Sequence, residues 1–278
     1  MNPEYVSALV QRYLEPIECC VRKHRVRKFS SAAAVELPVA ELKVKYQCVN
    51  SGCTANEADI KKYLTKFNNV ETWANSTGLW RPTASVMDLG AFGTFSDYAL
   101  AVSRQSRGND NRMVKKATRK GYQSRNLGVE LDMYEASVQA IHRSKMFRAG
   151  GLVLHLLAAP KSHLSDRFQA PTAPFCNQHW AIMWGVFTPH NNGERLIAYA
   201  TIGRTGNFVR TLHVMGHADF LRDGVMKLLF FDIVKWLLDR HDPFVQGIQY
   251  FLYGAVEHGR PGMFEWKRRF QFKPFLLK

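Results

Sequence analysis

The sequence predicts an α/β or α+β fold, in which a central mixed sheet is flanked by helices. Segments in the C-terminal half follow the order strand, strand, strand, helix, strand, helix, strand, which predicts a parallel pair of strands around the first helix. That helix, His217–Asp239, has apolar residues spaced by three and four, with charged residues opposite them. The second and third strands are joined by Thr205-Gly206-Asn207, which is typical of a hairpin turn.

The residues before Arg81 are expected to form a separate extension. Helical spacing predicts helices over Met1–Val21 and Ala58–Thr77, and alternation predicts a strand within Val35–Cys48. Turn-forming residues then interrupt the pattern. The expected division is a basic N-terminal helical extension, residues 1–80, and a main domain, residues 81–278.

The main domain is expected to open with a long basic helix, Phe95–Gly121. Thr94 or Ser96 would be its N-cap, and Gly121 is a typical stop signal. The remaining elements predicted by periodicity are, in chain order, a strand over Tyr122–Leu127, a helix over Asp132–Arg148, strands over His179–Thr188, Arg195–Arg204 and Phe208–Met215, the helix described above, a strand over Val245–Val256, a helix over Gly262–Phe270 and a strand over Phe272–Leu277.

Composition restricts the class of protein. In 278 residues, 46% are apolar and 12% aromatic, enough for a sizeable core, which excludes disorder for most of the chain. The longest apolar runs are too short for a spanning helix, and the first residues lack the pattern of a signal peptide. Five cysteines, an odd number, indicate reduced thiols, so we expect a cytoplasmic protein.

The charge is strongly positive, with 38 Lys and Arg against 23 Asp and Glu, a formal net charge of +15. It is clustered in Val21–Ser30, in Arg104–Arg125 and near the C-terminus from Arg260 onward. A single run of this kind is often only a solvated face, but three runs favour contact with phosphates. We therefore expect a nucleic acid, DNA or tRNA, as a partner.

The C-terminal part resembles a known group of enzymes. The matching features are Val114–Gly121 (VKKATRKG), the helix that ends at Trp236, the strand Tyr250-Phe-Leu-Tyr253-Gly254, and the terminal element Met263–Pro274. Together they resemble the acyltransferase fold shared by GNAT enzymes and the FemABX-type aminoacyl transferases, on the FemABX side, from about Arg81 to Lys278. In the terminal element, Gln271 replaces the usual glycine and Trp266 the usual phenylalanine.

The resemblance implies transfer of an acyl or aminoacyl group to an amine or a hydroxyl. CoA-dependent GNAT enzymes present a Gln/Arg-x-x-Gly-x-Gly/Ala loop to the pyrophosphate, whereas this chain has Leu221–Met226, in which only Gly224 fits. The expected donor is aminoacyl-tRNA or an acyl-CoA. The nucleic acid would be the donor as tRNA, or the acceptor as a DNA base. The alternatives are an acetyl-CoA-dependent N-acetyltransferase of a small molecule or protein and a non-catalytic nucleic-acid-binding protein on this fold.

Candidate catalytic residues follow from the same resemblance. Lys267 matches the lysine of the terminal element and would stabilise the negative charge of the transition state or bind a phosphate. Tyr253 would donate a proton to the leaving group, although a core tyrosine is the more ordinary role. A general base would come from the residues at the two strand ends that flank the long helix, where this fold opens: His213, His217, Asp219, Glu257 and His258.

Further candidates concern phosphates and metal. Guanidinium groups bind phosphate in a bidentate way, and the candidate phosphate-binding residues are Arg222, Gly224, Arg260, Arg268, Lys115, Lys116 and Arg119. No metal is expected at the catalytic site. Cys48 and Cys53, with Cys19 and Cys20 upstream, suggest a zinc site, but the spacing is not the usual one and free thiols are favoured.

Overall fold

A computed structural model describes residues 37–44, 57–68, 83–128, 132–144, 147–148, 151–152, 176–190, 193–256 and 261–278. The predicted helix Met1–Val21, the four cysteines proposed for zinc, and Glu257, His258 and Arg260 lie outside these residues.

The centre of the fold is a mixed sheet of eight strands, in the order β1-β10-β2-β9-β8-β7-β6-β3. Two neighbouring pairs, β8 with β9 and β1 with β10, are parallel, and the other pairs are antiparallel. The predicted mixed sheet with a parallel pair is therefore confirmed. The strands are β1 Val39–Ala40, β2 Ala84–Asp88, β3 Gln123–Gly128, β6 His179–His190, β7 Gly193–Thr205, β8 Phe208–Gly216, β9 Tyr250–Ala255 and β10 Lys273–Leu277.

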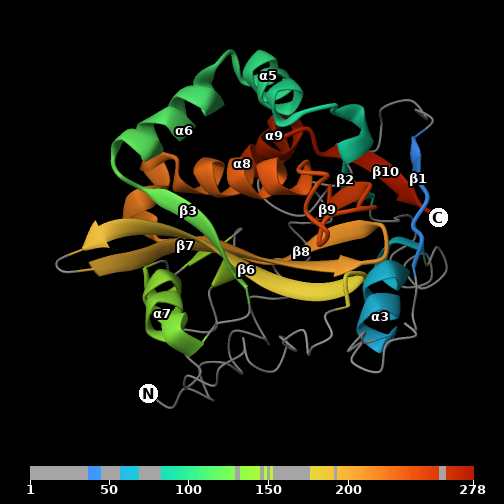
Figure 1. The fold of residues 1–278 in the computed structure, drawn as a ribbon, viewed down its shortest axis with the longest axis horizontal. Coiled ribbons are helices and arrows are strands. Elements are labelled where there is room, and N and C mark those ends of the chain that lie inside the picture. Colours follow the sequence, from blue (N-terminus) through green and yellow to red (C-terminus); the bar gives the residue numbers. More distant parts are fainter. Residues whose placement is uncertain are drawn as a thin grey trace.

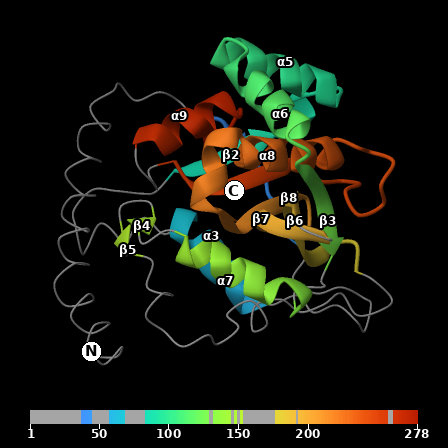
Figure 2. The ribbon, with the colours of Figure 1, turned by 90° about the vertical axis from the view of Figure 1, so that its left-hand side faces the viewer.

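Helices cover both faces of the sheet (Figures 1 and 2). One face carries α8 (Val225–Leu237), with α5 (Phe95–Ser106), α6 (Asn109–Arg119) and α9 (Pro261–Arg269) in an outer layer around it. The other face carries α3 (Glu57–Asn68) and α7 (Glu135–Arg143). A separate two-stranded hairpin is formed by β4 (Phe147–Arg148) and β5 (Gly151–Leu152).

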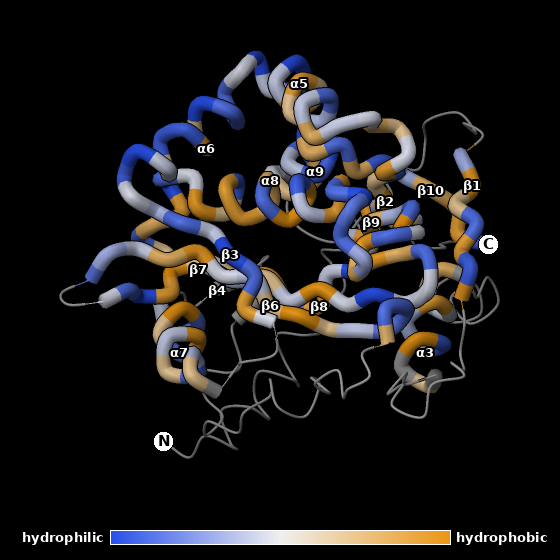
Figure 3. Tube along the Cα trace, viewed as in Figure 1, coloured by the Kyte–Doolittle hydropathy of each residue, from blue (hydrophilic) through white to orange (hydrophobic). Residues whose placement is uncertain are grey.

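Helix α8 is central because it is apolar on most of its circumference. Eight of its side chains are buried, among them Phe230 and Phe231, which contact the outer helices, and Leu229, which is fully buried. Figure 3 shows α8 as mostly hydrophobic and α6 as mostly hydrophilic. A helix that is hydrophobic nearly all round is stable only when it is covered on both sides, here by the sheet and by the outer helices.

The long helix predicted over His217–Asp239 begins later than expected. Residues Ala218–Asp223 form a 3-10 helix, η6, and α8 starts only after Gly224. Gly224 has φ +87°, and a Cβ there would lie 2.6 Å from the carbonyl oxygen of Met113 on α6. This left-handed residue ends η6 and lets α6 pack closely on the start of α8.

The prediction of a single basic helix over Phe95–Gly121 is wrong, because this segment forms two helices, α5 and α6. Arg107 (φ 52°) and Gly108 (φ 76°) are both left-handed and reverse the chain between them. Thr94 is confirmed as the N-cap of α5, in a reciprocal capping box with Asp97. The periodicity continues across the break, which is why the sequence pattern did not reveal it.

Other boundaries differ at element ends. α7 covers only part of Asp132–Arg148, and a short 3-10 turn, η3 (Asp132–Tyr134), precedes it. β9 begins at Tyr250 rather than Val245, because Asp242–Ile248 form turns fixed by backbone bonds to Asp239, Asp242 and Val245. The first strand is only Val39–Ala40.

The described part of residues 1–80 packs on the main sheet. β1 pairs with β10, and the amide N–H of Lys43 donates to Asn207 Oδ1 at 2.8 Å. Ile60, Leu64 and Phe67 of α3 belong to a core cluster that also contains residues of β2, β8, β9 and β10.

A substitution at Gly224 tests this packing. We expect Gly224→Ala to lower the free energy of unfolding by about 1–3 kcal/mol, because the new Cβ meets a backbone carbonyl and the residue keeps a positive φ. Urea unfolding measures the change. Gly193→Ala is the control, since nothing lies within 4 Å of its Cβ position; equal losses for the two variants would contradict the prediction.

Candidate active site

The parallel strands β8 and β9 diverge along their length. Their ladder joins Phe208–Arg210 to Tyr250–Leu252, whereas β8 continues to Gly216 and β9 to Ala255. At the point of divergence the hydroxyl of Thr211 donates to the carbonyl oxygen of Leu252 at 3.4 Å. Beyond it the two strands are no longer paired, which we call the opening between β8 and β9: β8 leads into η6, and β9 ends at Ala255, before α9.

A β-bulge in β8 explains the divergence. Thr211 pairs with Ile202 and His213 with Thr201, so Leu212 is an extra residue on β8. The hydroxyl of Thr201 accepts the N–H of His213 at 2.9 Å and stabilises the bulge. A bulge bends its strand and increases the local twist, which turns the end of β8 away from β9.

Lys267 lies at the β9 side of this opening. Its side chain is 3% exposed, and Nζ donates to the carbonyl oxygen of Ala255, the last residue of β9, at 2.5 Å. Nζ is also 5.4 Å from the ring centroid of Tyr253. The carbonyl oxygen of Ala255 and the ring of Tyr253 thus hold the Lys267 amino group at the end of β9.

Tyr253 stands on β9 just beyond the end of the ladder. Its ring is part of an aromatic wall with Phe230, Trp266 and Phe272, at centroid distances of 5.5, 5.2 and 5.5 Å. The wall is apolar, and it lowers the local polarity around Lys267, which strengthens electrostatic interactions there.

His217 follows directly after β8 and is mostly buried. Its Nε2 is 3.2 Å from Nη2 of Arg195, and its Nδ1 is 3.6 Å from Oδ2 of Asp219. The amide N–H of Asp219 donates to Nδ1 at 3.4 Å, which makes His217 the N-cap of η6, and Nε2 lies against the guanidinium of Arg195. Burial, and then Arg195, lower the pKa of His217, so the ring is neutral near pH 7.

The other predicted acid–base residues are placed differently. Asp219 has 79% of its side chain exposed, in the first turn of η6. His213 lies within β8 at the bulge, four residues before His217. The structure thus places His213, His217 and Asp219 along and directly after β8, and Lys267 and Tyr253 at the end of the neighbouring strand β9.

The predicted phosphate site at the start of α8 contains a carboxylate of the chain itself. Asp223 accepts from Lys116 at 3.0 Å, from Lys120 at 2.7 Å and from the hydroxyl of Tyr122 at 3.0 Å. Lys116 also donates to the carbonyl oxygen of Arg222 at 3.2 Å. Hydrogen bonds from Lys120 and Lys116 lower the pKa of Asp223 to about 2. An anion binding here would have to displace Asp223.

The remaining basic candidates lie on the outer layer. Arg268 is bonded to Glu265 of its own helix and to Gln105. The side chain of Arg222 is exposed. Exposed side chains without a carboxylate partner in the described part of the chain form what we call the α5–α6 basic stripe: Arg104, Arg107, Arg112, Lys115 and Arg119.

Sequence reasoning missed three residues that shape the site. Arg195, Asp223 and Asp110 are single charged residues that belong to no recognisable motif, and their partners come from distant parts of the chain.

Within the described residues, no group of three His, Cys, Asp or Glu side chains could hold a metal ion. None of the described helices is long and apolar enough to cross a membrane.

No protein-family model matches the chain, and no curated protein matches it. Among solved structures, it is similar to the C-terminal domain of a putative lysylphosphatidylglycerol synthetase from Agrobacterium fabrum (TM-score 0.42, 17% identity, 69% of this chain and 57% of that chain). It is also similar to L-PGS from Bacillus licheniformis (0.44, 13%, 69% and 57%) and to a tandem GNAT protein from the clavulanic acid pathway (0.43, 16%, 73% and 54%). The chain thus spans little more than half the length of these structures.

The ion pairs of Asp223 predict a pH-dependent stability. A carboxylate whose pKa is lowered on folding stabilises the protein above its unfolded pKa, and this contribution is lost as the pH falls toward the folded pKa. We expect Asp223→Asn to lower the free energy of unfolding at pH 7 by about 1 kcal/mol, a modest value because both lysines are half-exposed.

Urea unfolding at a series of pH values checks this expectation. The difference between wild type and Asp223→Asn should shrink as the pH falls from 3.8, the ordinary pKa of an aspartate, through about 2, the pKa of Asp223 in the folded protein. A difference that stays constant through this pH range would argue against the ion pairs as its cause.

Proposed function

We propose that the chain is an acyl- or aminoacyltransferase of the GNAT or FemABX-like kind that works at the opening between β8 and β9. The observation that carries the proposal is the buried Lys267 ammonium at the end of β9, beside an opening whose other side carries a neutral His217. Acyl transfer needs a base for the acceptor and a fixed positive charge for the oxyanion, and these two groups supply them.

The residues would act in sequence. An acceptor amine or hydroxyl replaces Arg195 at Nε2 of His217, loses its proton there and attacks the acyl carbonyl carbon. Lys267 stabilises the oxyanion of the tetrahedral intermediate. As the new C–N or C–O bond forms, the bond from the acyl carbon to the leaving group breaks, and Tyr253 donates a proton to the departing atom. The proton held by His217 then returns to the phenolate through solvent.

We further propose a nucleic acid as one of the reactants, supported by the α5–α6 basic stripe. Arg112, Lys115 and Arg119 follow one another at a spacing of three and four on α6, so their side chains share one face of the helix. The exposed positions of α6 are all polar. A helix that lies in a membrane surface presents an apolar face as well, so this stripe is better suited to phosphates alone.

The donor is better described as aminoacyl-tRNA than as CoA. The start of α8, where a CoA pyrophosphate would bind, holds Asp223 and is covered by the backbone of α6 at Gly224. A DNA base as acceptor is the second form of the proposal. Acetyl-CoA-dependent transfer to a small molecule would require the Asp223 side chain and the backbone of α6 to move away from the start of α8.

Lys267→Met tests the catalytic proposal. Methionine keeps much of the side-chain volume but removes the charge, so we expect the transfer rate to fall about 100-fold or more while nucleic-acid binding is unchanged. The assay follows labelled aminoacyl groups from a mixture of charged tRNAs to amines, nucleosides and duplex DNA, with products identified by mass spectrometry.

Lys235→Met is the matched control, since Lys235 is exposed on α8. A Lys267→Met protein that folds and transfers at the wild-type rate would exclude Lys267 from catalysis. Binding of nucleic acid without transfer by the wild type would instead indicate the non-catalytic protein, and transfer from acetyl-CoA alone the N-acetyltransferase.

A triple substitution, Arg112→Gln with Lys115→Gln and Arg119→Gln, tests the basic stripe. We expect weaker tRNA binding and a slope of log K against log salt that is smaller by about 2 to 3, because up to three phosphate contacts are lost. The control removes three exposed charges elsewhere, at Lys235, Arg240 and Lys273. Equal effects of the two triple variants would contradict a specific role of the α5–α6 basic stripe in tRNA binding. Binding of the wild type to anionic vesicles but not to tRNA would indicate that the partner is a lipid surface and not a nucleic acid.

A further inference from the structure

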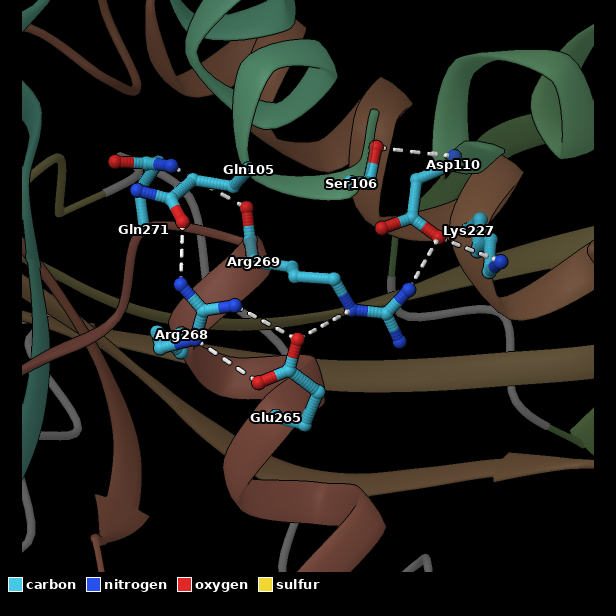
Figure 4. A network of polar contacts seen from close by, with 8 residues as sticks. All are labelled: Gln105, Ser106, Asp110, Lys227, Glu265, Arg268, Arg269 and Gln271. Atoms are coloured by element: carbon cyan, nitrogen blue, oxygen red, sulfur yellow. Dashed lines mark hydrogen bonds and ion pairs between the residues drawn. The ribbon is translucent and has the colours of Figure 1, made fainter. Parts of the chain in front are cut away.

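Asp110 is a fully buried carboxylate that joins three helices (Figure 4). It stands in the first turn of α6, and its Oδ1 lies 2.6 Å from Nζ of Lys227 on α8 and 3.2 Å from Nη1 of Arg269 on α9. Its own amide N–H donates to Oγ of Ser106 at 3.2 Å, at the end of α5. One side chain therefore links the outer helices to the central one.

A second set of contacts extends this cluster along α9. Glu265 accepts from Arg268 at 2.8 and 2.9 Å and lies 3.6 Å from Nε of Arg269. Arg268 in turn donates to Gln105 of α5. The last turn of α9 thus has polar contacts to Gln105 of α5 and to Asp110 of α6, and its polar link to α8 runs through Asp110, as Figure 4 shows.

The packing of α9 on the rest of the protein is otherwise aromatic. Trp266 and Phe270 stack on each other at 4.5 Å, and both contact Phe230 of α8. These edge-to-face and stacked ring contacts hold α9 against α8, and the ion pair of Arg269 adds a second, polar constraint. Buried ion pairs are sensitive to geometry, and their contribution to a unique arrangement can exceed their contribution to stability.

We infer that Asp110 is a positioning residue for Lys267, acting through Arg269. Lys267 and Arg269 are two residues apart on α9, so they project to nearly opposite sides of the helix. Lys267 reaches the end of β9, and Arg269 reaches Asp110. The helix is held from both sides, and its register sets where the Lys267 ammonium stands in the opening between β8 and β9. The inference rests on the proposed function only in the role that it gives to Lys267.

Asp110→Asn tests the inference without any activity measurement. The first readout is the ¹H–¹⁵N signal of the Lys267 ammonium, assigned by its loss in Lys267→Met. The second is amide hydrogen exchange in residues 264–270. We expect the signal to shift or broaden and exchange in α9 to become about tenfold faster, because the ion pair that holds Arg269 is lost.

Asp223→Asn is the matched control, since Asp223 is also ion-paired to α6 but does not contact α9. It should leave the Lys267 signal and α9 exchange unchanged. If Asp110→Asn does not fold, Arg269→Gln removes the same link at a partly exposed side chain, with Lys235→Gln, an exposed lysine of α8, as its control. We expect Arg269→Gln to reproduce the effects and to add nothing in the double variant with Asp110→Asn.

Loss of stability with an unchanged Lys267 signal and unchanged α9 exchange would overturn the inference and leave Asp110 as a structural residue. The transfer assay separates this result from failure of the proposed function. If Lys267→Met transfers normally while Asp110→Asn disturbs α9, the positioning stands and the catalytic role of Lys267 fails. If Asp110 positions Lys267 and Lys267 is catalytic, Asp110→Asn should lower kcat and leave the KM for the charged tRNA unchanged.

Discussion

The extra residue in β8 is the constraint on which the candidate site depends. Leu212 is an extra residue in β8, and the β8–β9 ladder ends at Arg210 and Leu252, just before it. β9 has a register shift of its own against β2 between Leu252 and Ala255, where Gly254 has φ +60°. Two irregularities in neighbouring strands therefore accompany the divergence, and the end of β9 supplies the carbonyl oxygen that accepts from Lys267.

Two aspartates organise the basic layer above the sheet, and they do so under different electrostatic conditions. Asp223 is close to solvent and has three partners, so its pKa is low and its contribution is modest and pH-dependent. Asp110 is completely buried with two cations, and its Oδ2 has no hydrogen-bond partner among the described residues. Burial, and then the charge of Asp110, raise the pKa of nearby Tyr98, which stays protonated. The two carboxylates attach α6 at two points along its length.

The sequence pattern predicted the part of the fold that depends on local periodicity. The order of β6 to β10 with α8 and α9 follows from alternation, helical spacing and one hairpin turn, and the structure has that order. The breaks at Arg107-Gly108 and at Gly224 were missed because left-handed residues leave the periodicity of their neighbours intact. The partners of Asp110 and Asp223 were missed for another reason. Arg269 is 159 positions from Asp110, and Tyr122 is 101 positions from Asp223, so only the folded chain reveals the pairs.

The basic side chains of the outer helices fall into two groups, those paired with carboxylates and those without a carboxylate partner in the described part of the chain. Lys116 and Lys120 pair with Asp223 near the surface, and Lys227 and Arg269 pair with the buried Asp110; these pairs hold α6, η6, α8 and α9 together. The α5–α6 basic stripe has no such partners in the described chain and faces outward. Lys116 is four residues after Arg112 and therefore borders the stripe, whereas the two pairs of Asp110 are buried beneath α6. Under the proposed function, a polyanion bound to the stripe would leave the Asp110 pairs, and with them the register of α9, in place.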